Sequence, residues 1–221
     1  MTEAQVAITP RKSRILEVLG LICLFFFLIT LVITVTINFR PLYLLAIDRF
    51  DLLLISGLDK ATLLDNFDQL MDFLNKPWLT SMNLPDFPMS EAGYGHFVDV
   101  KKLFLLNYGV LLVTFIPAMF YLRHLHKSAR LWKLVRPFQW GMGVPVVLGF
   151  VMAAGFDTFF VKFHELFFSN DDWLFDPATD PIINVLPEGF FMYCFILAFV
   201  LVEVFFFGMV VVGRRSVRKI V

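Results

Sequence analysis

The sequence has few charged residues for its length, and this scarcity excludes an ordinary soluble domain. Charged side chains make up 17% of the 221 residues and hydrophobic ones 58%, and the mean hydropathy is +0.75. A typical soluble domain has about 25% charged residues. The 19 basic and 19 acidic residues cancel, so no excess of positive charge indicates a nucleic-acid partner. We therefore expect an integral membrane protein that binds no nucleic acid.

Cysteine is also scarce, and several familiar site motifs are missing. Cys23 and Cys194 lie inside long apolar runs, where they form neither a disulfide framework nor a cluster of metal ligands. The sequence contains no glycine-rich phosphate loop and no Gly-x-Ser-x-Gly elbow of the serine hydrolases. We accordingly expect a protein without a cofactor.

Four apolar stretches are long enough to cross a bilayer as helices. A hydrocarbon core of about 30 Å needs roughly 20 apolar residues in a helix. The stretches are 15–37, 103–122, 138–161 and 189–213. The first is too long for the apolar part of a signal peptide and ends without a small-residue cleavage site, so we expect an uncleaved helix. The sequence predicts a single all-α membrane domain over residues 1–221, built as a four-transmembrane-helix bundle.

Basic residues near the ends of these stretches predict the orientation of the bundle. Twelve of the 19 basic residues lie before the first stretch, between the second and third, or after the fourth. They are Arg11, Lys12, Arg14, Arg123, Lys127, Arg130, Lys133, Arg136, Arg214, Arg215, Arg218 and Lys219. Most acidic residues lie in the two other connecting segments, about 39–102 and 162–188. Because basic loops stay in the cytoplasm, we expect both termini there and both acidic segments on the extracytoplasmic side of the cell membrane.

The first outer segment is predicted to fold into a helical cap. Asp59 can cap a helix with apolar residues at helical spacing, and Pro77 cannot continue that helix. Before it, the apolar stretch 41–55 is expected to form a helix lying in the membrane interface. A further helix is expected to begin near Ser90 and to lead into the second span.

Two histidines in the outer segments are the most informative side chains. His96 and Asp99 are three residues apart and share one face of a helix above the second span. We expect the carboxylate to orient the imidazole and to favour its charged form, although a purely structural contact fits the same spacing. His164 ends the predicted third span.

A cluster of polar residues follows His164 before the fourth span. Asn170 and the indole N–H of Trp173 are donors near the membrane surface, where they could stabilise an oxyanion. Asp176 precedes a proline and Glu188 follows one, which is typical of helix starts. The candidate supporting residues are Asp99, Asn170, Trp173, Asp176, Asp180 and Glu188. Arg40 and Lys101 are candidates for binding lipid head groups or substrate carbonyls, although anchoring at the interface is the simpler explanation of both.

Two blocks of this sequence resemble the lipoprotein intramolecular transacylase (Lit) family of Gram-positive bacteria. The first block is His-Phe-Val-Asp-Val-Lys at 96–101. The second begins with Phe-His at 163–164 and continues as Phe-Ser-Asn-Asp-Asp-Trp-Leu-Phe-Asp-Pro-Ala-Thr-Asp-Pro-Ile-Ile at 168–183. It ends with Leu-Pro-Glu at 186–188. The four-span plan agrees with this resemblance.

The resemblance implies an acyl transfer within one substrate molecule. Such enzymes move an acyl chain from the glyceryl sn-2 oxygen of a diacylglyceryl-modified lipoprotein to the α-amine of its N-terminal cysteine, which gives a lyso-form lipoprotein. It also implies that His96 and His164 form the catalytic acid–base pair, on the extracytoplasmic side. The expected partners are the lipoprotein substrate and membrane lipids.

Two other functions remain open from the residues alone. One is a non-catalytic accessory protein whose outer cap binds a partner. The other is a metal-dependent intramembrane hydrolase, with a metal held by His96, His164 and nearby aspartates. The zincin pattern does not support the second, because His164-Glu165 is not followed by the required second histidine.

Overall fold

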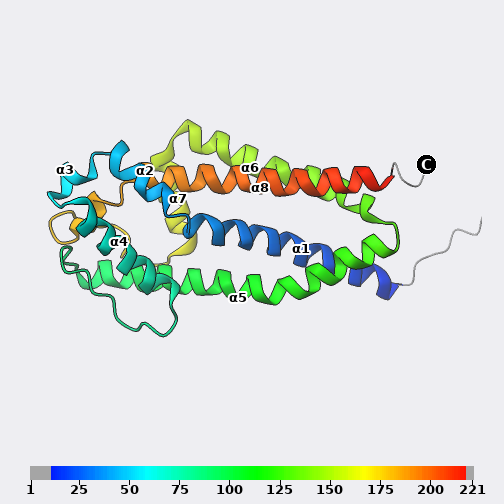
Figure 1. The fold of residues 1–221 in the computed structure, drawn as a ribbon, viewed down its shortest axis with the longest axis horizontal. Coiled ribbons are helices and arrows are strands. Elements are labelled where there is room, and N and C mark those ends of the chain that lie inside the picture. Colours follow the sequence, from blue (N-terminus) through cyan, green and yellow to red (C-terminus); the bar gives the residue numbers. More distant parts are fainter. Residues whose placement is uncertain (1–10, 218–221) are drawn as a thin grey trace, which may run out of the picture.

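The computed structural model describes residues 11–217, and the side chains of residues 14–216, as a long bundle of helices with a cap at one end (Figure 1). In chain order the helices are α1 (Arg11–Ile37), α2 (Pro41–Arg49), α3 (Leu52–Ser56), α4 (Lys60–Asn75), α5 (Glu91–Lys127), α6 (Val135–Ala154), α7 (Phe156–Phe167) and α8 (Glu188–Val217), with short 3-10 helices η1 (Leu131–Leu134) and η2 (Pro181–Asn184). These described residues include no strand, which agrees with the all-α prediction.

Four helical segments of the described chain are long and apolar enough to span a membrane, as the sequence predicts. They are Arg14–Ile37, Glu91–Lys127, Leu131–Ala154 and Glu188–Ser216. Large apolar side chains on their outer surfaces are exposed, for example Leu112, Val113 and Phe150. A helix that is apolar on all sides is suited to lipid rather than to water, so this exposed surface is the one that faces the bilayer.

Helix α5 is longer than a bilayer requires, and its excess length reaches the cap. Its 37 residues span about 55 Å at 1.5 Å per residue, against a hydrocarbon core of about 30 Å. The part at 91–102 projects into the cap (Figure 1), where α5 packs beside α4. Ser90 starts this helix as expected, because its hydroxyl accepts a hydrogen bond from the Gly93 N–H at 2.9 Å.

The third span differs from the prediction. Helix α6 ends at Ala154, the backbone is extended at Gly155, and α7 begins at Phe156. Since aromatic and aliphatic residues continue across this break, hydropathy alone could not reveal it. Phenylalanines of α7 contact both Phe191 and Phe195 of α8, so α7 is a separate helix that packs on the half of α8 nearer the cap. His164 thus lies on this short helix and not at the end of a span.

The cap confirms one predicted helix and corrects another. The Asp59 carboxylate accepts hydrogen bonds from the backbone N–H groups of residues 61 and 62, and α4 ends before Pro77, as expected. The predicted helix over 41–55 is wrong, since α2 and α3 are separated at Asp51, whose φ is 50°. Aspartate adopts this left-handed conformation more readily than most residues do. Tyr43 of α2 is 1% exposed and stacks on Phe67 of α4 at 3.8 Å, which fixes the cap.

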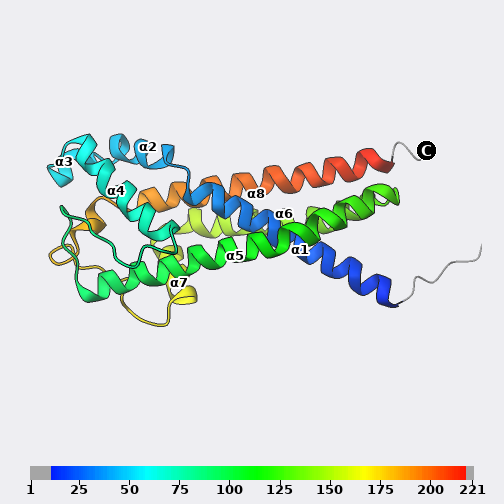
Figure 2. The same ribbon diagram turned by 60° about the horizontal axis from the view of Figure 1, so that its bottom comes forward.

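The first turn of α1 and the last turn of α8 lie at the same end of the bundle, opposite the cap (Figures 1 and 2). At this end, Glu17 of α1 forms salt bridges with Arg130 and with Lys133. The arrangement agrees with two termini on one side of the membrane, and the cytoplasmic assignment of that side stays a prediction. Some of the basic side chains that support this assignment lie outside the described residues, namely those of Arg11, Lys12, Arg218 and Lys219.

Candidate active site

The structure brings together the two histidines that the sequence singles out. His96 lies on the projecting part of α5, and His164 lies on α7. Their ring centroids are 5.8 Å apart, with 38° between the ring planes. The side chains are buried, with 9% and 8% of the two residues exposed. Two imidazoles from distant parts of the chain therefore meet at the cap end of the bundle.

Aromatic rings from three segments enclose the pair. The His96 ring is 4.8 Å from Phe168 and 5.5 Å from Phe175. Trp173 stacks on His164 at 4.9 Å, with 27° between the planes. The rings exclude water from the imidazoles, so the polar groups that remain interact more strongly than they would in solvent.

Burial keeps His96 neutral. It lowers the pKa of His96 to about 4, with a further lowering from nearby His164, while the Asp99 carboxylate acts weakly in the opposite direction. The expectation that Asp99 favours a charged His96 thus has the correct sign but is outweighed by burial. The His96 Nδ1 atom is buried and has no hydrogen-bond partner among the described residues. A buried nitrogen left without a partner is costly in a native structure and requires an explanation.

His164 is held in one tautomer by its own helix. Its Nδ1 lies 2.8 Å from the carbonyl oxygen of Phe160. A carbonyl only accepts hydrogen bonds, so Nδ1 carries the proton and Nε2 of the neutral ring has a free lone pair. Burial lowers the pKa of His164, and the hydrogen bond to Phe160 partly offsets this effect. His164 is therefore prepared to accept a proton at Nε2.

Asp99 contacts the loop after α7 and not the imidazole. Its carboxylate accepts hydrogen bonds from Asn170 Nδ2 at 3.0 Å and from Lys102 Nζ at 2.7 Å. These bonds lower the pKa of Asp99. In the described part of the chain, Asp99 has no hydrogen bond with His96. Asp99 thus fixes the loop against α5 and does not orient the His96 ring as expected.

The two predicted oxyanion donors already donate hydrogen bonds within the protein. The indole N–H of Trp173 donates to the backbone carbonyl of Asn170 at 3.0 Å, so it is used within the loop. The Asn170 side-chain amide donates one N–H to Asp99 and keeps its second N–H. Trp173 therefore contributes the stacking surface for His164, and Asn170 is the remaining candidate donor.

Asp176 and Asp180 shape the loop that carries these residues. Asp176 accepts a hydrogen bond from the Ala178 N–H at 2.9 Å in a turn, so the predicted helix start there is wrong. The chain turns at 176–180 and continues into η2. Asp180 is 3% exposed, and its carboxylate accepts from the Ser90 N–H at 2.8 Å and the Thr179 hydroxyl at 2.7 Å. Asp180 therefore joins the loop to the start of α5.

Glu188 begins α8, as the sequence predicts. It neighbours Asp157 of α7, which carries a charge of the same sign, so its role in the structure is to start α8. In the described part of the chain, no group of three or more histidine, cysteine, aspartate or glutamate residues is arranged to hold a metal ion.

The two cations proposed for head-group binding are engaged elsewhere. Arg40 pairs with Asp68 of α4 through two hydrogen bonds of 2.9 and 2.7 Å. Lys101 is 9% exposed, donates to the carbonyls of Lys76 and Leu79, and lies 4.2 Å from the centre of the Phe73 ring. Both residues thus hold the cap on the bundle.

The sequence analysis assigns no role to three residues that contribute to this site. A Cβ atom at Gly93, one turn before His96, would overlap the Asp180 carboxylate, so the close approach of loop and helix depends on glycine. The rings of Phe168 and Phe175 surround His96, but 28 phenylalanines in the chain give these two no distinguishing signal. Only the positions of both rings beside the polar cluster could have indicated them.

Comparisons with known proteins agree on one family and one overall fold. A family model described as lipoprotein intramolecular transacylase Lit matches residues 18–191. A solved structure of the membrane integral lipoprotein intramolecular transacylase Lit from Bacillus cereus is similar, with a TM-score of 0.88 and 29% identity over 93% of this chain and 96% of that chain. Two structures of that protein with a histidine replaced by arginine or by alanine have TM-scores of 0.80 and 28% identity, over 93% of this chain and 92% or 94% of theirs. No curated protein sequence is significantly similar.

Proposed function

The chain belongs to the family of lipoprotein intramolecular transacylases, and we propose that it transfers the sn-2 acyl chain of a diacylglyceryl-modified lipoprotein to the α-amine of the N-terminal cysteine. The product is a lyso-form lipoprotein. The observation that carries the proposal is the pair of buried imidazoles whose centroids are 5.8 Å apart. Both acceptor and donor groups belong to one substrate, so the site needs to orient them and to move one proton.

Orientation supplies much of the rate in such a reaction. Effective concentrations in well-oriented intramolecular reactions correspond to about 7–11 kcal/mol of the barrier. The apolar, aromatic walls around His96 and His164 suit the acyl chain and glyceryl ester of the substrate. They also keep water away from the carbonyl carbon, which favours aminolysis over hydrolysis.

His164 acts as the base. Its Nε2 lone pair accepts a proton from the attacking amine, whose reference pKa of about 7.7–8.0 suits an imidazole partner. The hydrogen bond from Nδ1 to Phe160 stabilises the imidazolium that forms. The neutral amine attacks the ester carbonyl and gives this proton to His164 as the C–N bond forms, with the second amide N–H of Asn170 as a donor to the oxyanion.

His96 returns the proton to the leaving group. Neutral His96 cannot release a proton on its own, because an imidazolate would result. It therefore receives a proton at one ring nitrogen from His164 while its other nitrogen donates to the sn-2 oxygen. The carbonyl C–O bond to sn-2 breaks, the C–N bond to the amine forms, and one proton moves from nitrogen to oxygen. Direct transfer to the tethered amine takes precedence over an acyl-imidazole intermediate.

The reaction takes place on the extracytoplasmic side of the cell membrane. The imidazoles lie at the cap end of the bundle, opposite the basic end that carries Arg130 and Lys133, and the positive-inside rule assigns that basic end to the cytoplasm. A lipidated N-terminal cysteine at the outer leaflet can therefore reach the site.

The proposal is tested with purified protein and a synthetic diacylglyceryl lipopeptide. Tandem mass spectrometry should show one acyl chain moved from glycerol to the N-terminal nitrogen, with no change in total mass. Loss of a fatty acid to water would instead indicate a hydrolase, and an unchanged substrate would contradict the proposal. A stable acyl adduct on His96 or His164 during turnover would replace direct transfer by the two-step route.

A further inference from the structure

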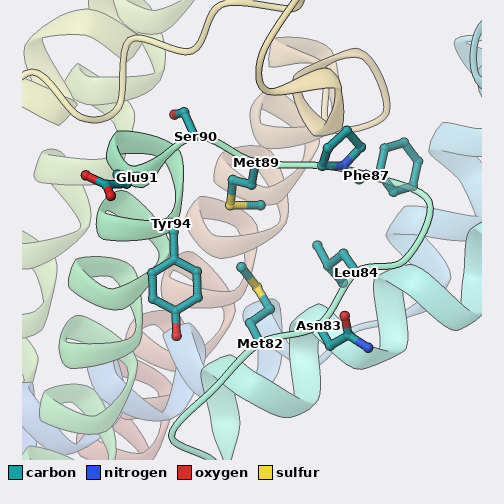
Figure 3. Close-up of a pocket in the computed structure, with 9 residues that line it drawn as sticks. Met82, Asn83, Leu84, Phe87, Met89, Ser90, Glu91 and Tyr94 are labelled. Atoms are coloured by element: carbon teal, nitrogen blue, oxygen red, sulfur yellow. The ribbon is translucent and has the colours of Figure 1, made fainter.

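A hollow beside the start of α5 has no part in the acyl transfer itself. It has a volume of about 400 Å³ and lies between the segment 82–90 and the first turns of α5 (Figure 3). Pockets that bind small ligands measure about 300–1,000 Å³. The hollow is therefore large enough for several atoms of a bound chain and is not merely a packing defect.

The wall of the hollow is in contact with the helix that carries His96. Met89, one of its walls, packs on Gly93, with 3.0 Å between the Met89 Cγ atom and the position of a Cβ at Gly93. Gly93 and His96 are three residues apart and lie on one helix face. Ser90, in the same wall, is bonded to Asp180 of the loop that encloses the imidazoles. From His96 to Ser90 the helix rises about 9 Å.

The side chains of the hollow suit a ligand of variable sequence. Met82 and Met89 extend into it from opposite sides, and Tyr94 lies along its edge (Figure 3). Methionine is flexible and polarisable, and methionine-rich surfaces repack around different partners. An enzyme that modifies lipoproteins must accept polypeptides that differ after the modified cysteine, so such a surface matches this requirement.

We propose that the hollow binds the polypeptide that follows the modified cysteine of the substrate lipoprotein. This inference rests on the proposed function. The lipid part of the substrate has to remain at the membrane, so its polypeptide has to leave beyond His96, in the direction of the cap. An extended chain covers about 9 Å in roughly three residues. The residues from about the third after the cysteine therefore reach Met82, Met89 and Tyr94.

Two synthetic substrates test the inference. One is diacylglyceryl-cysteine amide, and the other has the same lipidated cysteine followed by six uncharged residues. Wild-type protein should convert the longer substrate with a kcat/KM about tenfold higher, within the range that one apolar pocket contact gives an enzyme. Met82→Trp, which fills the hollow, should abolish this advantage and leave the short substrate unaffected. Ser81→Trp, an exposed neighbour outside the hollow, should retain the advantage.

Other results would overturn the inference. Equal rates for the two substrates with wild-type protein would show that the hollow gives no binding energy to the polypeptide. If Met82→Trp lowers kcat/KM equally for both substrates, the smaller change Met82→Ala is measured next. The inference requires Met82→Ala to lower kcat/KM for the longer substrate only. If wild-type protein converts neither substrate, the proposed function itself fails. Conversion of both without a length preference contradicts this inference alone.

Discussion

The amide of Asn170 donates a hydrogen bond to the carboxylate of Asp99 at 3.0 Å, across 71 residues of sequence. This contact joins the loop that carries Trp173 to the helix that carries His96. Because Trp173 stacks on His164, the bond helps to set the separation of the two imidazoles. Asp99 and Asn170 are thus positioning residues, and Asn170 has its second N–H for the substrate.

Removing either partner should slow the reaction through this shared contact. We expect Asp99→Ala and Asn170→Ala to lower kcat/KM by about tenfold or more, and the double variant to lose less than the product of the two effects. A double-mutant cycle should give a coupling of about 0.5–3 kcal/mol, typical of residues in contact. Lys102→Ala removes the exposed second partner of Asp99 and should change kcat/KM little. Fully multiplicative losses would show that Asp99 and Asn170 act separately.

Gly93 allows the loop to approach α5 closely, so a methyl group there should be costly. Gly93→Ala forces the Asp180 carboxylate away and should destabilise the fold by about 1–3 kcal/mol, the usual cost of overpacking. Gly109 in the same helix has open space where a Cβ would lie. Gly109→Ala should therefore stabilise the fold by about 0.5–1 kcal/mol. Thermal unfolding in detergent compares the two variants. Equal midpoints would contradict the contact between Gly93 and Asp180.

The buried imidazoles make stability depend on pH in one direction. Burial lowers the pKa of His96 to about 4 and also lowers the pKa of His164, whereas an unfolded histidine has a pKa of about 6.5. Between these values the unfolded chain binds more protons, so stability is complete above about pH 6.5 and declines as the pH falls toward 4. His96→Leu should reduce the drop in melting temperature between pH 7 and pH 5. An identical drop in the variant would show that His96 is not buried as described.

The pH dependence of activity should reflect the pKa of the substrate amine and not that of a solvent-exposed histidine. Because both imidazoles are neutral at pH 7, the amine of the substrate has to lose its proton before attack. We expect kcat/KM to rise with pH around a midpoint near the amine pKa of about 8. A midpoint near 6.5 would indicate that a solvent-exposed histidine limits the reaction.

Hydropathy and capping residues predicted much of the fold. Three of the four spans, the caps at Asp59 and Ser90 and the start of α8 at Glu188 follow from local rules, because lipid requires apolar helices and helix ends require acceptors. The break at Gly155 did not follow, since phenylalanines continue on both sides and packing on α8 decides the direction of α7. The turn after Asp176 was likewise decided by tertiary contacts of Asp180.

The sequence singled out the two histidines of the candidate site but not the contacts of the residues around them. His96 and His164 were singled out in the two outer segments and paired through the resemblance to the Lit family, and the structure places their rings together. The partners of Asp99, Trp173, Arg40 and Lys101 depend on contacts between distant segments, which spacing along the chain does not encode. Burial likewise determines the charge of His96, and burial is a property of the folded protein.

The central claim is tested most directly by the N-terminus of a lipoprotein made in cells that lack N-acylating enzymes and express this chain. Mass spectrometry of the N-terminal peptide should show an N-acyl, S-monoacylglyceryl cysteine with the wild-type chain and with His124→Ala, a control at the opposite end of α5. His96→Ala and His164→Ala, produced at equal levels in the membrane, should leave the diacylglyceryl form with a free amine. A lyso-form lipoprotein that persists in either of these two variants would contradict the acid–base pair.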